Sequence, residues 1–244
     1  MRKAAIKAAI WDLDDILVDT KSFQRTAQQK ALRTVTVPND QIAHCVSIWD
    51  RLLWFFDQED YIGILRAIVS ELDLNVSDGL IEYAAKAADD VWNESIPVVQ
   101  GVEHCLEYLL NYNILLGVVS NGRETEQHKK LIDANLHRFF GQDAVIISKD
   151  SRDRKPNPSM LLEFCRLHSV DPAQAIYIGD RVTDVIAANL AGTTSILIPR
   201  DAPENKEPPT NGKIGLEIPT HYLNSYDELF VLLRKMLFDD ANDD

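Results

Sequence analysis

The sequence predicts an α/β fold: a doubly wound, Rossmann-like parallel sheet with a helical cap domain inserted after the first strand. Two observations support this. From residue 98 onward, short apolar strands alternate with helices, which is the pattern of a parallel sheet. A similar strand lies near the N-terminus, and a long stretch of helical periodicity separates it from the others. We therefore predict a core of residues 1–16 and 98–244, with a cap at residues 17–97.

The first strand is predicted at "AAIWDLD", residues 8–14, because this run is short, apolar and ends abruptly in acidic residues. In the inserted segment, "DQIAHCVSIWDRLLWFFDQ" places apolar residues three and four apart, as an amphipathic helix does. "DYIGILRAIVSEL" and "DGLIEYAAKAADDVWNES" have the same spacing, and each begins with an Asp that can cap a helix. The insertion is thus predicted to be helical, with hinges at residues 15–20 and 96–101.

Beyond residue 98 the pattern alternates. The helix "GVEHCLEYLLNYN" precedes the strand "ILLGVVS", which is apolar along its length, as in a sheet covered on both faces. Three further helix–strand pairs follow: "RETEQHKKLIDANL" with "AVIIS", "NPSMLLEFCRLHS" with "AIYIG", and "VTDVIAANLAG" with "TSILIP". A Pro-rich loop, a last helix at "DELFVLLRKML" and an acidic tail complete the chain.

The composition excludes several classes of function. The chain has 244 residues, a formal net charge of -13 and 45% hydrophobic residues. Such a charge repels nucleic acid and anionic membranes, although a bound metal or a local cation can still attract a small phosphorylated substrate. The three cysteines lack metal-site spacing, and no run approaches the roughly 20 apolar residues of a membrane span. We expect a cytoplasmic protein without nucleic-acid or membrane partners; its oligomeric state, monomer or homodimer, stays open.

Polar residues follow four of the predicted strands, at the sheet edge where open α/β folds bind ligands. These residues are Asp12 and Asp14, then Ser120, Asn121 and Gly122, then Lys155, and finally Asp180 and Asp184. Carboxylates gathered in one cleft cannot all stay ionised without compensation, and Mg²⁺ prefers oxygen ligands of this kind. The set therefore predicts a magnesium site.

The same residues suit phosphoryl transfer. Asp12 and Asp14 are two apart and would share a face on an extended strand, so one can attack phosphorus while the other transfers a proton. Ser120, together with the backbone N–H groups of Asn121 and Gly122, can hold phosphoryl oxygens. The ammonium of Lys155 can stabilise the negative charge that develops during transfer.

The motifs "WDLDDILVDT", "LLGVVSNG", "KPNPSM" and "IYIGDRVTD" resemble, in order, the four motifs of the haloacid dehalogenase-like hydrolase superfamily. The resemblance covers nearly the whole chain, including a helical cap after the first motif. It implies that Asp12 is the nucleophile and Asp14 the general acid/base, which is typical of the phosphatase branch. The motif form and the large cap look closest to phosphatases of nucleotides, sugar phosphates or phosphoglycolate.

The resemblance also implies a ligand set. Ser120 and Lys155 would bind the phosphoryl group. Mg²⁺ would be held by Asp12, the backbone carbonyl of Asp14, and Asp180, with Asp184 supporting it through water. Asp180 and Asp184 could instead cap the helix that follows the strand, and Asp184 could have both roles.

Two departures and several alternatives accompany this interpretation. The family usually has Gly or another small residue where this chain has Asp15, and Thr, sometimes Val, where it has Ile16. Arg123 and Arg181 flank the predicted cleft and either reach a second phosphate or form surface ion pairs. A phosphomutase of the same superfamily, a receiver-like phospho-acceptor and a non-catalytic binding module remain alternatives. A receiver domain would, however, be about half this length.

Overall fold

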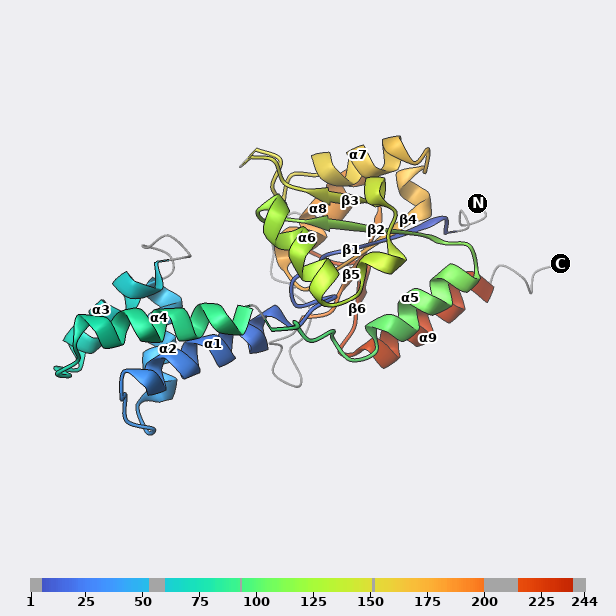
Figure 1. The fold of residues 1–244 in the computed structure, drawn as a ribbon. Coiled ribbons are helices and arrows are strands. Elements are labelled where there is room, and N and C mark those ends of the chain that lie inside the picture. The colour runs from blue at the N-terminus through green and yellow to red at the C-terminus, as the bar shows by residue number, and fades with distance from the viewer. Residues whose placement is uncertain (1–5, 53–59, 93, 151, 200–214, 239–244) are drawn as a thin grey trace. The chain divides into compact units, whose positions relative to one another are not determined.

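The computed structural model describes residues 6–52, 60–92, 94–150, 152–199 and 215–238. The chain divides into two units, Met1–Asp19 with Val98–Asp244 and Thr20–Pro97, as the ribbon in Figure 1 shows. The first unit contains the sheet, and the second is helical. The predicted α/β class is thus confirmed.

The sheet has the strand order β3-β2-β1-β4-β5-β6 within the described residues, and every neighbouring pair is parallel. Its strands are β1 (Ala8–Trp11), β2 (Leu115–Ser120), β3 (Val145–Ile147), β4 (Ala175–Gly179), β5 (Thr194–Leu197) and β6 (His221–Tyr222). β1 pairs with β2 on one side and β4 on the other. The strand order reverses at β1, and such a switch point is where α/β sheets bind ligands.

Five α-helices of the described residues accompany the sheet: α5 (Val102–Asn111), α6 (Glu124–Asp133), α7 (Ser159–Leu167), α8 (Val182–Ala191) and α9 (Tyr226–Phe238). Three short 3₁₀ turns lie at η1 (His137–Phe139), η2 (Gln142–Ala144) and η3 (Pro172–Gln174). In Figure 1, α7 and α8 lie over one face of the sheet, while α5 and α9 pack along each other on the opposite side. Buried Ile10, Phe164 and Ala188 belong to the core beneath α7 and α8.

β4 has the predicted bounds, and β2, β3 and β5 each lie within a longer predicted run. The prediction at residues 8–14 was too long, because β1 ends at Trp11 and a turn begins there. The sequence also did not predict β6, whose two residues are half-buried and carry no apolar run. The Pro-rich loop and the acidic tail lie outside the described residues.

The second unit contains α1 (Thr20–Thr34), α2 (Ile42–Leu52), α3 (Tyr61–Glu71) and α4 (Asp78–Trp92). α1 packs against α4 and α2, and α3 packs against both α2 and α4. The rest of the helix predicted after Leu52 lies outside the described residues. The predicted Asp cap of α3 is confirmed, since the Asp60 carboxylate accepts from the N–H of Gly63 at 2.8 Å.

The Asp cap predicted for α4 was wrong. Asp78 lies inside the first turn of the helix, where its carboxylate pairs with Arg66 at 3.0 Å. Ser77 precedes it, and the Ser77 hydroxyl accepts from the N–H of Leu80 at 3.4 Å. Ser is as good an N-cap residue as Asp, and the two are adjacent, so the pattern alone did not distinguish them.

The two chain segments that border the insertion are joined inside the first unit. Val18 forms an antiparallel bridge with Val98, and the N–H of Val99 donates to the carbonyl of Leu17 at 3.0 Å. The hydroxyl of Tyr226, from α9, donates to the carbonyl of Ile16. Gly101 has φ +92°, and a Cβ there would lie 2.7 Å from the Cβ of Tyr226, so glycine is required for both reasons.

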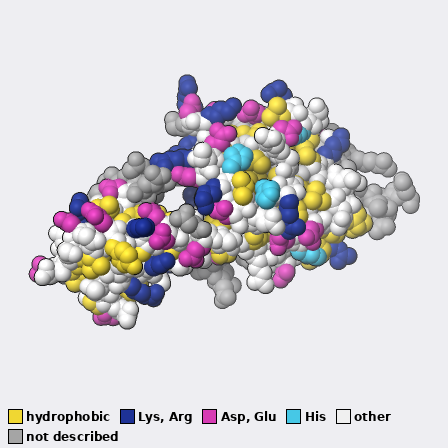
Figure 2. All heavy atoms as spheres, viewed as in Figure 1, with side chains coloured by type: hydrophobic (Ala, Val, Ile, Leu, Met, Phe, Trp, Pro, Cys, Tyr) yellow, Lys and Arg dark blue, Asp and Glu magenta, His cyan; other side chains and the backbone are white. Residues whose placement is uncertain are grey.

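Surface features are ordinary for this composition. Figure 2 shows acidic and basic side chains interspersed on the viewed face. Among the described helices, none is both long and apolar enough to span a membrane.

Candidate active site

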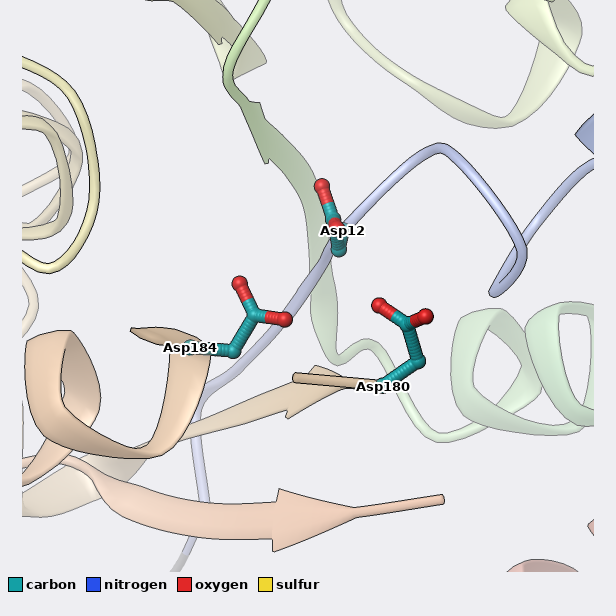
Figure 3. Close-up of side chains that lie close together, drawn as sticks. All are labelled: Asp12, Asp180 and Asp184. Carbon is teal, nitrogen blue, oxygen red and sulfur yellow. The ribbon is translucent and has the colours of Figure 1, made fainter. Parts of the chain in front are cut away.

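Three carboxylates converge at the carboxyl ends of β1 and β4. Asp12 follows β1, Asp180 follows β4, and Asp184 lies in the first turn of α8. One oxygen from each lies within 4.8 Å of the others, and Figure 3 shows the side chains directed toward one another. The fold therefore brings Asp12 close to Asp184, although the two residues are 172 positions apart in the chain.

The turn after β1 places its acidic residues differently. The N–H of Asp12 still donates to the carbonyl of Ile178 at 2.8 Å, so Asp12 extends the ladder with β4. Asp15 has φ +62°, a left-handed conformation that Gly, Asn and Asp adopt more readily than other residues. This explains why Asp is accepted where the resembling family usually has Gly. The assumption that Asp12 and Asp14 share the face of one strand was wrong, because the strand ends at Trp11.

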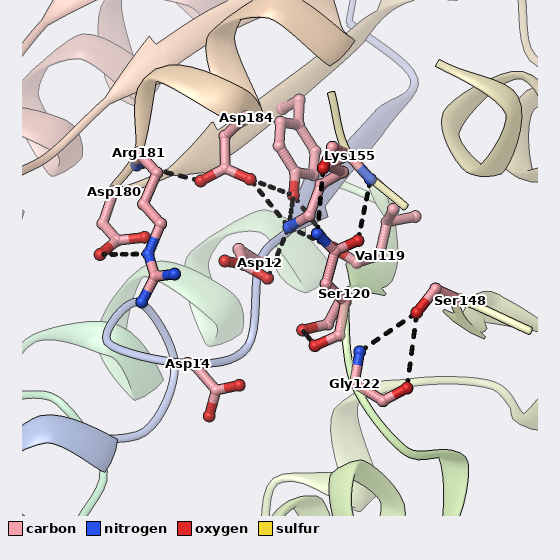
Figure 4. Close-up of polar contacts among 12 residues, drawn as sticks. Asp12, Asp14, Val119, Ser120, Gly122, Ser148, Lys155, Asp180, Arg181 and Asp184 are labelled. Atoms are coloured by element: carbon pink, nitrogen blue, oxygen red, sulfur yellow. Dashed lines mark hydrogen bonds and ion pairs between the residues drawn. The ribbon is translucent and has the colours of Figure 1, made fainter. Parts of the chain in front are cut away.

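Lys155 is the central cation of the cluster. Its Nζ lies 2.8 Å from a carboxylate oxygen of Asp12 and 2.8 Å from one of Asp184, and it is buried. It also donates to the Tyr177 hydroxyl at 2.7 Å and to the Val119 carbonyl at 3.2 Å, as Figure 4 shows. A buried ammonium needs this compensation, since desolvation of a charge costs several kcal/mol.

The Asn121 side chain holds the backbone of Lys155. The N–H of Lys155 donates to the Asn121 side-chain oxygen at 2.9 Å, and the Asn121 amide donates back to the Lys155 carbonyl at 3.2 Å. The loop after β3 is thereby fixed to the end of β2. The Asn121 side chain is thus engaged in positioning Lys155.

Tyr177 was not identified from the sequence. It is fully buried in β4, accepts from Lys155, and lies 3.0 Å from the Val119 carbonyl and 3.3 Å from Asp184. Burial, followed by the neighbouring Asp184 and Asp12 carboxylates, raises its pKa well above 10.0. The only available signal was a hydroxyl-bearing aromatic residue in the otherwise apolar "AIYIG".

Asp184 has two structural roles at once. One carboxylate oxygen pairs with Lys155, while the other accepts from the N–H of Arg181 at 3.0 Å and caps α8. The predicted capping role of Asp184 is thus confirmed, and its metal-supporting role stays a prediction. The Nε of Arg181 lies 3.8 Å from Asp180, and Arg123 pairs with Glu126 at 3.1 Å.

The end of β2 and the residues after it supply a second polar group. Ser120 is buried, and the N–H of Gly122 donates to the Ser148 hydroxyl at 3.2 Å. That N–H therefore already has a partner. Ser148 directly follows β3 and was not identified from the sequence; one polar residue at the end of an apolar strand is too weak a signal.

The electrostatics of the cluster favour a cation. Burial raises the pKa of Asp12 to about 6, although the Lys155 ammonium lowers it. Burial, with the Asp184 and Asp12 carboxylates, raises the pKa of Asp180 to about 7. Burial alone would lower the pKa of Lys155, but the neighbouring carboxylates outweigh it and the net shift is upward. Negative charge thus remains incompletely compensated by the protein.

The donor set fits Mg²⁺. One oxygen of Asp180 is buried and accepts no hydrogen bond from the part of the chain that the structure describes. Asp180 belongs to the group of Asp12, Asp180 and Asp184, and this group offers three closely spaced carboxylate oxygens. Mg²⁺ is a hard cation that takes one or two carboxylates, together with waters and phosphate oxygens. The residues present therefore suit the metal.

Known proteins are similar to this chain in sequence. The sequence profile of the haloacid dehalogenase-like hydrolases matches residues 9–198. A glyceraldehyde 3-phosphate phosphatase of Methanopyrus kandleri is 26% identical, over 96% of this chain and 100% of that protein. A phosphorylated carbohydrates phosphatase of Thermotoga maritima is 22% identical, over 92% of this chain and 100% of that protein.

Solved structures share the fold. A haloacid dehalogenase-family hydrolase of Deinococcus radiodurans, crystallised with phosphate and sodium, has a TM-score of 0.69 at 20% identity, covering 96% of this chain and 97% of that one. A putative β-phosphoglucomutase of Thermotoga maritima has a TM-score of 0.69 at 17% identity, covering 94% and 99%. With a profile match over most of its length, the chain belongs to the haloacid dehalogenase-like hydrolases.

Proposed function

We propose that this protein is a Mg²⁺-dependent phosphatase that hydrolyses a small phosphorylated metabolite through an aspartyl-phosphate on Asp12. The observation that carries the proposal is the position of Asp12: its carboxylate lies beside Lys155 and within the group formed with Asp180 and Asp184. A nucleophile in that position has a cation on one side and a candidate metal site on the other.

The reaction would proceed in two steps. The Asp12 carboxylate attacks phosphorus, the bond to the leaving oxygen breaks, and Asp14 gives that oxygen a proton. Asp14 then accepts a proton from the water that attacks the phosphorus of the aspartyl-phosphate, which releases phosphate and regenerates Asp12. In Figure 4, Asp14 lies apart from the Asp12–Lys155 network and is thus available as a separate acid/base group.

The other residues bind the phosphoryl group and organise the site. Lys155 and the Ser120 hydroxyl would contact phosphoryl oxygens, and Asn121 would hold Lys155 in place. Gly122 would supply close packing of the loop, since its N–H is engaged by Ser148. Mg²⁺ held by Asp12, the Asp14 carbonyl, Asp180 and Asp184 would neutralise charge on the phosphoryl group.

The substrate class follows from relatives and from the site. Relatives over most of this chain are named as phosphatases of glyceraldehyde 3-phosphate, of phosphorylated carbohydrates and of phosphoglycolate. All three kinds of substrate are small anionic phosphates of polar carbon skeletons. We propose a substrate of this kind in the cytoplasm, a location that the three buried free cysteines support.

Phosphate release tests the proposal. Purified protein with Mg²⁺ should release phosphate from p-nitrophenyl phosphate and from a subset of a sugar-phosphate and glycolate-phosphate panel. Asp12→Asn should lower the rate to below about one thousandth, while the exposed Asp143→Asn control should retain it. Undiminished turnover by Asp12→Asn would refute the mechanism, and a phosphorylated sugar product without free phosphate would indicate a phosphomutase instead.

A further inference from the structure

Two side chains of α6 hold the carboxylate of Asp14. The Gln127 side-chain nitrogen donates to one Asp14 oxygen at 2.8 Å, and the Lys130 ammonium donates to the other at 2.6 Å. Gln127 and Lys130 are three residues apart and therefore lie on the same face of the helix. Each oxygen of Asp14 thus has its own donor, and the rotation of the carboxylate is restricted from both sides.

Gln127 is built into the site. It is only 2% exposed, although burial of an amide is costly unless the amide is hydrogen-bonded. Its nitrogen also lies 2.9 Å from the carbonyl of Asn121 and 3.3 Å from the Ser120 hydroxyl. The Asp14 carboxylate and the Asn121 carbonyl only accept hydrogen bonds, so the amide nitrogen must face them. One side chain therefore connects the turn after β1 with the end of β2.

Gly122 makes room for this arrangement. A Cβ at position 122 would lie 2.6 Å from the side-chain nitrogen of Gln127 and 2.9 Å from two of its carbons. Such contacts would push the amide away from Asp14. The glycine that follows Ser120 and Asn121 thereby acquires a role besides that of a turn residue.

Lys130 completes the pair of donors. The side chains of Lys130 and Asp14 are 18% and 24% exposed, so their ion pair is largely sheltered from water. Ion pairs on an open surface contribute little, whereas a short, sheltered one restricts its partner more strongly. The neighbouring Lys129 instead pairs with Asp133 along the exposed side of the same helix.

We propose that Gln127 and Lys130 are positioning residues that fix the Asp14 carboxyl group for proton transfer to the leaving oxygen. The inference rests on the proposed function, because it assumes that Asp14 is the general acid/base. Without the two donors, the carboxyl group is held less firmly, and the population aimed at the leaving oxygen falls. Lys155 keeps its own contacts in that case, and the Ser120 hydroxyl loses the Gln127 donor but keeps its bond to the Asn121 carbonyl.

Leaving-group dependence distinguishes this role from a merely structural one. Phenyl phosphate and p-nitrophenyl phosphate have nearly the same shape, but phenolate is the poorer leaving group and depends more on a proton from Asp14. Lys130→Met should lower kcat/KM for phenyl phosphate about ten- to a hundredfold, and that for p-nitrophenyl phosphate by less than about threefold. Gln127→Leu should act in the same direction.

Matched variants complete the design. Lys130→Arg retains a cationic donor and should recover much of the phenyl phosphate activity, and Lys129→Met should leave both substrates unaffected. Asp14→Ala provides the reference, with a larger loss in the same selective pattern. Lys130 is partly exposed, so its variants are expected to fold even if Gln127→Leu does not.

The results for these variants test the positioning role of Lys130 separately from the proposed function. An equal loss on both substrates for Lys130→Met, or no loss, would overturn the positioning role while an inactive Asp12→Asn still supports the proposed function. Retained activity in Asp12→Asn, or the lack of a selective loss in Asp14→Ala, would overturn the proposed mechanism and the positioning role with it. A selective loss that Lys130→Arg restores is the result we expect.

Discussion

Asp180 makes a testable link between the proposed metal site and the stability of the protein. Its pKa is raised from 3.8 to about 7, first by burial and then by the Asp184 and Asp12 carboxylates. The folded, metal-free protein therefore binds a proton at this position more tightly than the unfolded chain does. The resulting stabilisation is complete below about pH 4 and is lost as the pH rises through about 7.

The magnitude follows from the shift. A change of about 3 pKa units corresponds to about 4 kcal/mol, at about 1.36 kcal/mol per unit. The side chain of Asp180 is 10% exposed, so solvent screening reduces this little. Asp12, whose pKa is raised to about 6, acts in the same direction but titrates as part of the same cluster, so the two contributions are not simply additive.

The substitution Asp180→Asn tests this prediction, because it replaces the carboxylate by a neutral side chain of the same shape. With a metal chelator present at about pH 8, the free energy of unfolding of the variant should exceed that of the wild type by about 2–4 kcal/mol. At about pH 4 the two free energies should be nearly equal. The variant should nevertheless lose activity. Asp180 would then lower the stability of the protein in the absence of Mg²⁺, as functional groups often do.

Amide hydrogen exchange of β4, measured at several pH values with matched correction for intrinsic exchange, reports the opening of the core directly. Asp143→Asn, at an exposed position, controls for the loss of one negative charge. Mg²⁺ at saturating concentration should stabilise the wild type and have little effect on Asp180→Asn. A metal-free wild type whose stability is constant between about pH 4 and pH 8, or an Asp180→Asn variant no more stable at pH 8, would show that the Asp180 carboxylate does not control the stability.

Three further predictions concern the residues around the site. Tyr226→Phe removes the donor to the buried Ile16 carbonyl and should lower the unfolding free energy in urea by about 1–3 kcal/mol; an unchanged value would mean that water replaces the hydroxyl. Asp15→Gly should be tolerated, whereas Asp15→Val should cost about 1–3 kcal/mol in the same assay because φ is +62°; equal stabilities would contradict the left-handed turn. Lys155→Met leaves buried Asp12 without its cation, so we expect a loss of about 3–5 kcal/mol at neutral pH and of phosphate release, and a fully stable variant would argue against the pair.

The sequence predicted the sheet and most of the acidic cluster because both depend on strand ends. An apolar run fixes where a buried strand lies, and parallel strands end at one edge, so Asp12 and Asp180 could be placed together without any coordinates. The geometry of Asp14 could not be predicted in this way. It depends on a backbone turn that begins one residue after Trp11, and a turn of this kind has no periodicity to detect.

Gln127 and Lys130 were missed for a different physical reason. The helix itself was predicted, but the rotation of a helix about its axis depends on its packing, and α6 is polar along much of its length: "ETEQHKKLID". An inward Gln and an outward Gln look alike in such a run. Only the tertiary contact with a residue more than a hundred positions away shows which one is buried.

The charge balance of the described site connects its stability with its proposed ligand. Five carboxylates, those of Asp12, Asp14, Asp15, Asp180 and Asp184, interact with the three cationic side chains of Lys130, Lys155 and Arg181. A formal charge of about −2 remains when all are ionised, and the neighbouring carboxylates add to burial, the larger cause, in raising the pKa values of Asp12 and Asp180. A divalent cation removes the same imbalance without protonating the nucleophile. A phosphate ester, itself an anion, should therefore bind the metal-free site weakly at neutral pH, and Mg²⁺ should increase its affinity more than it increases that of a neutral analogue.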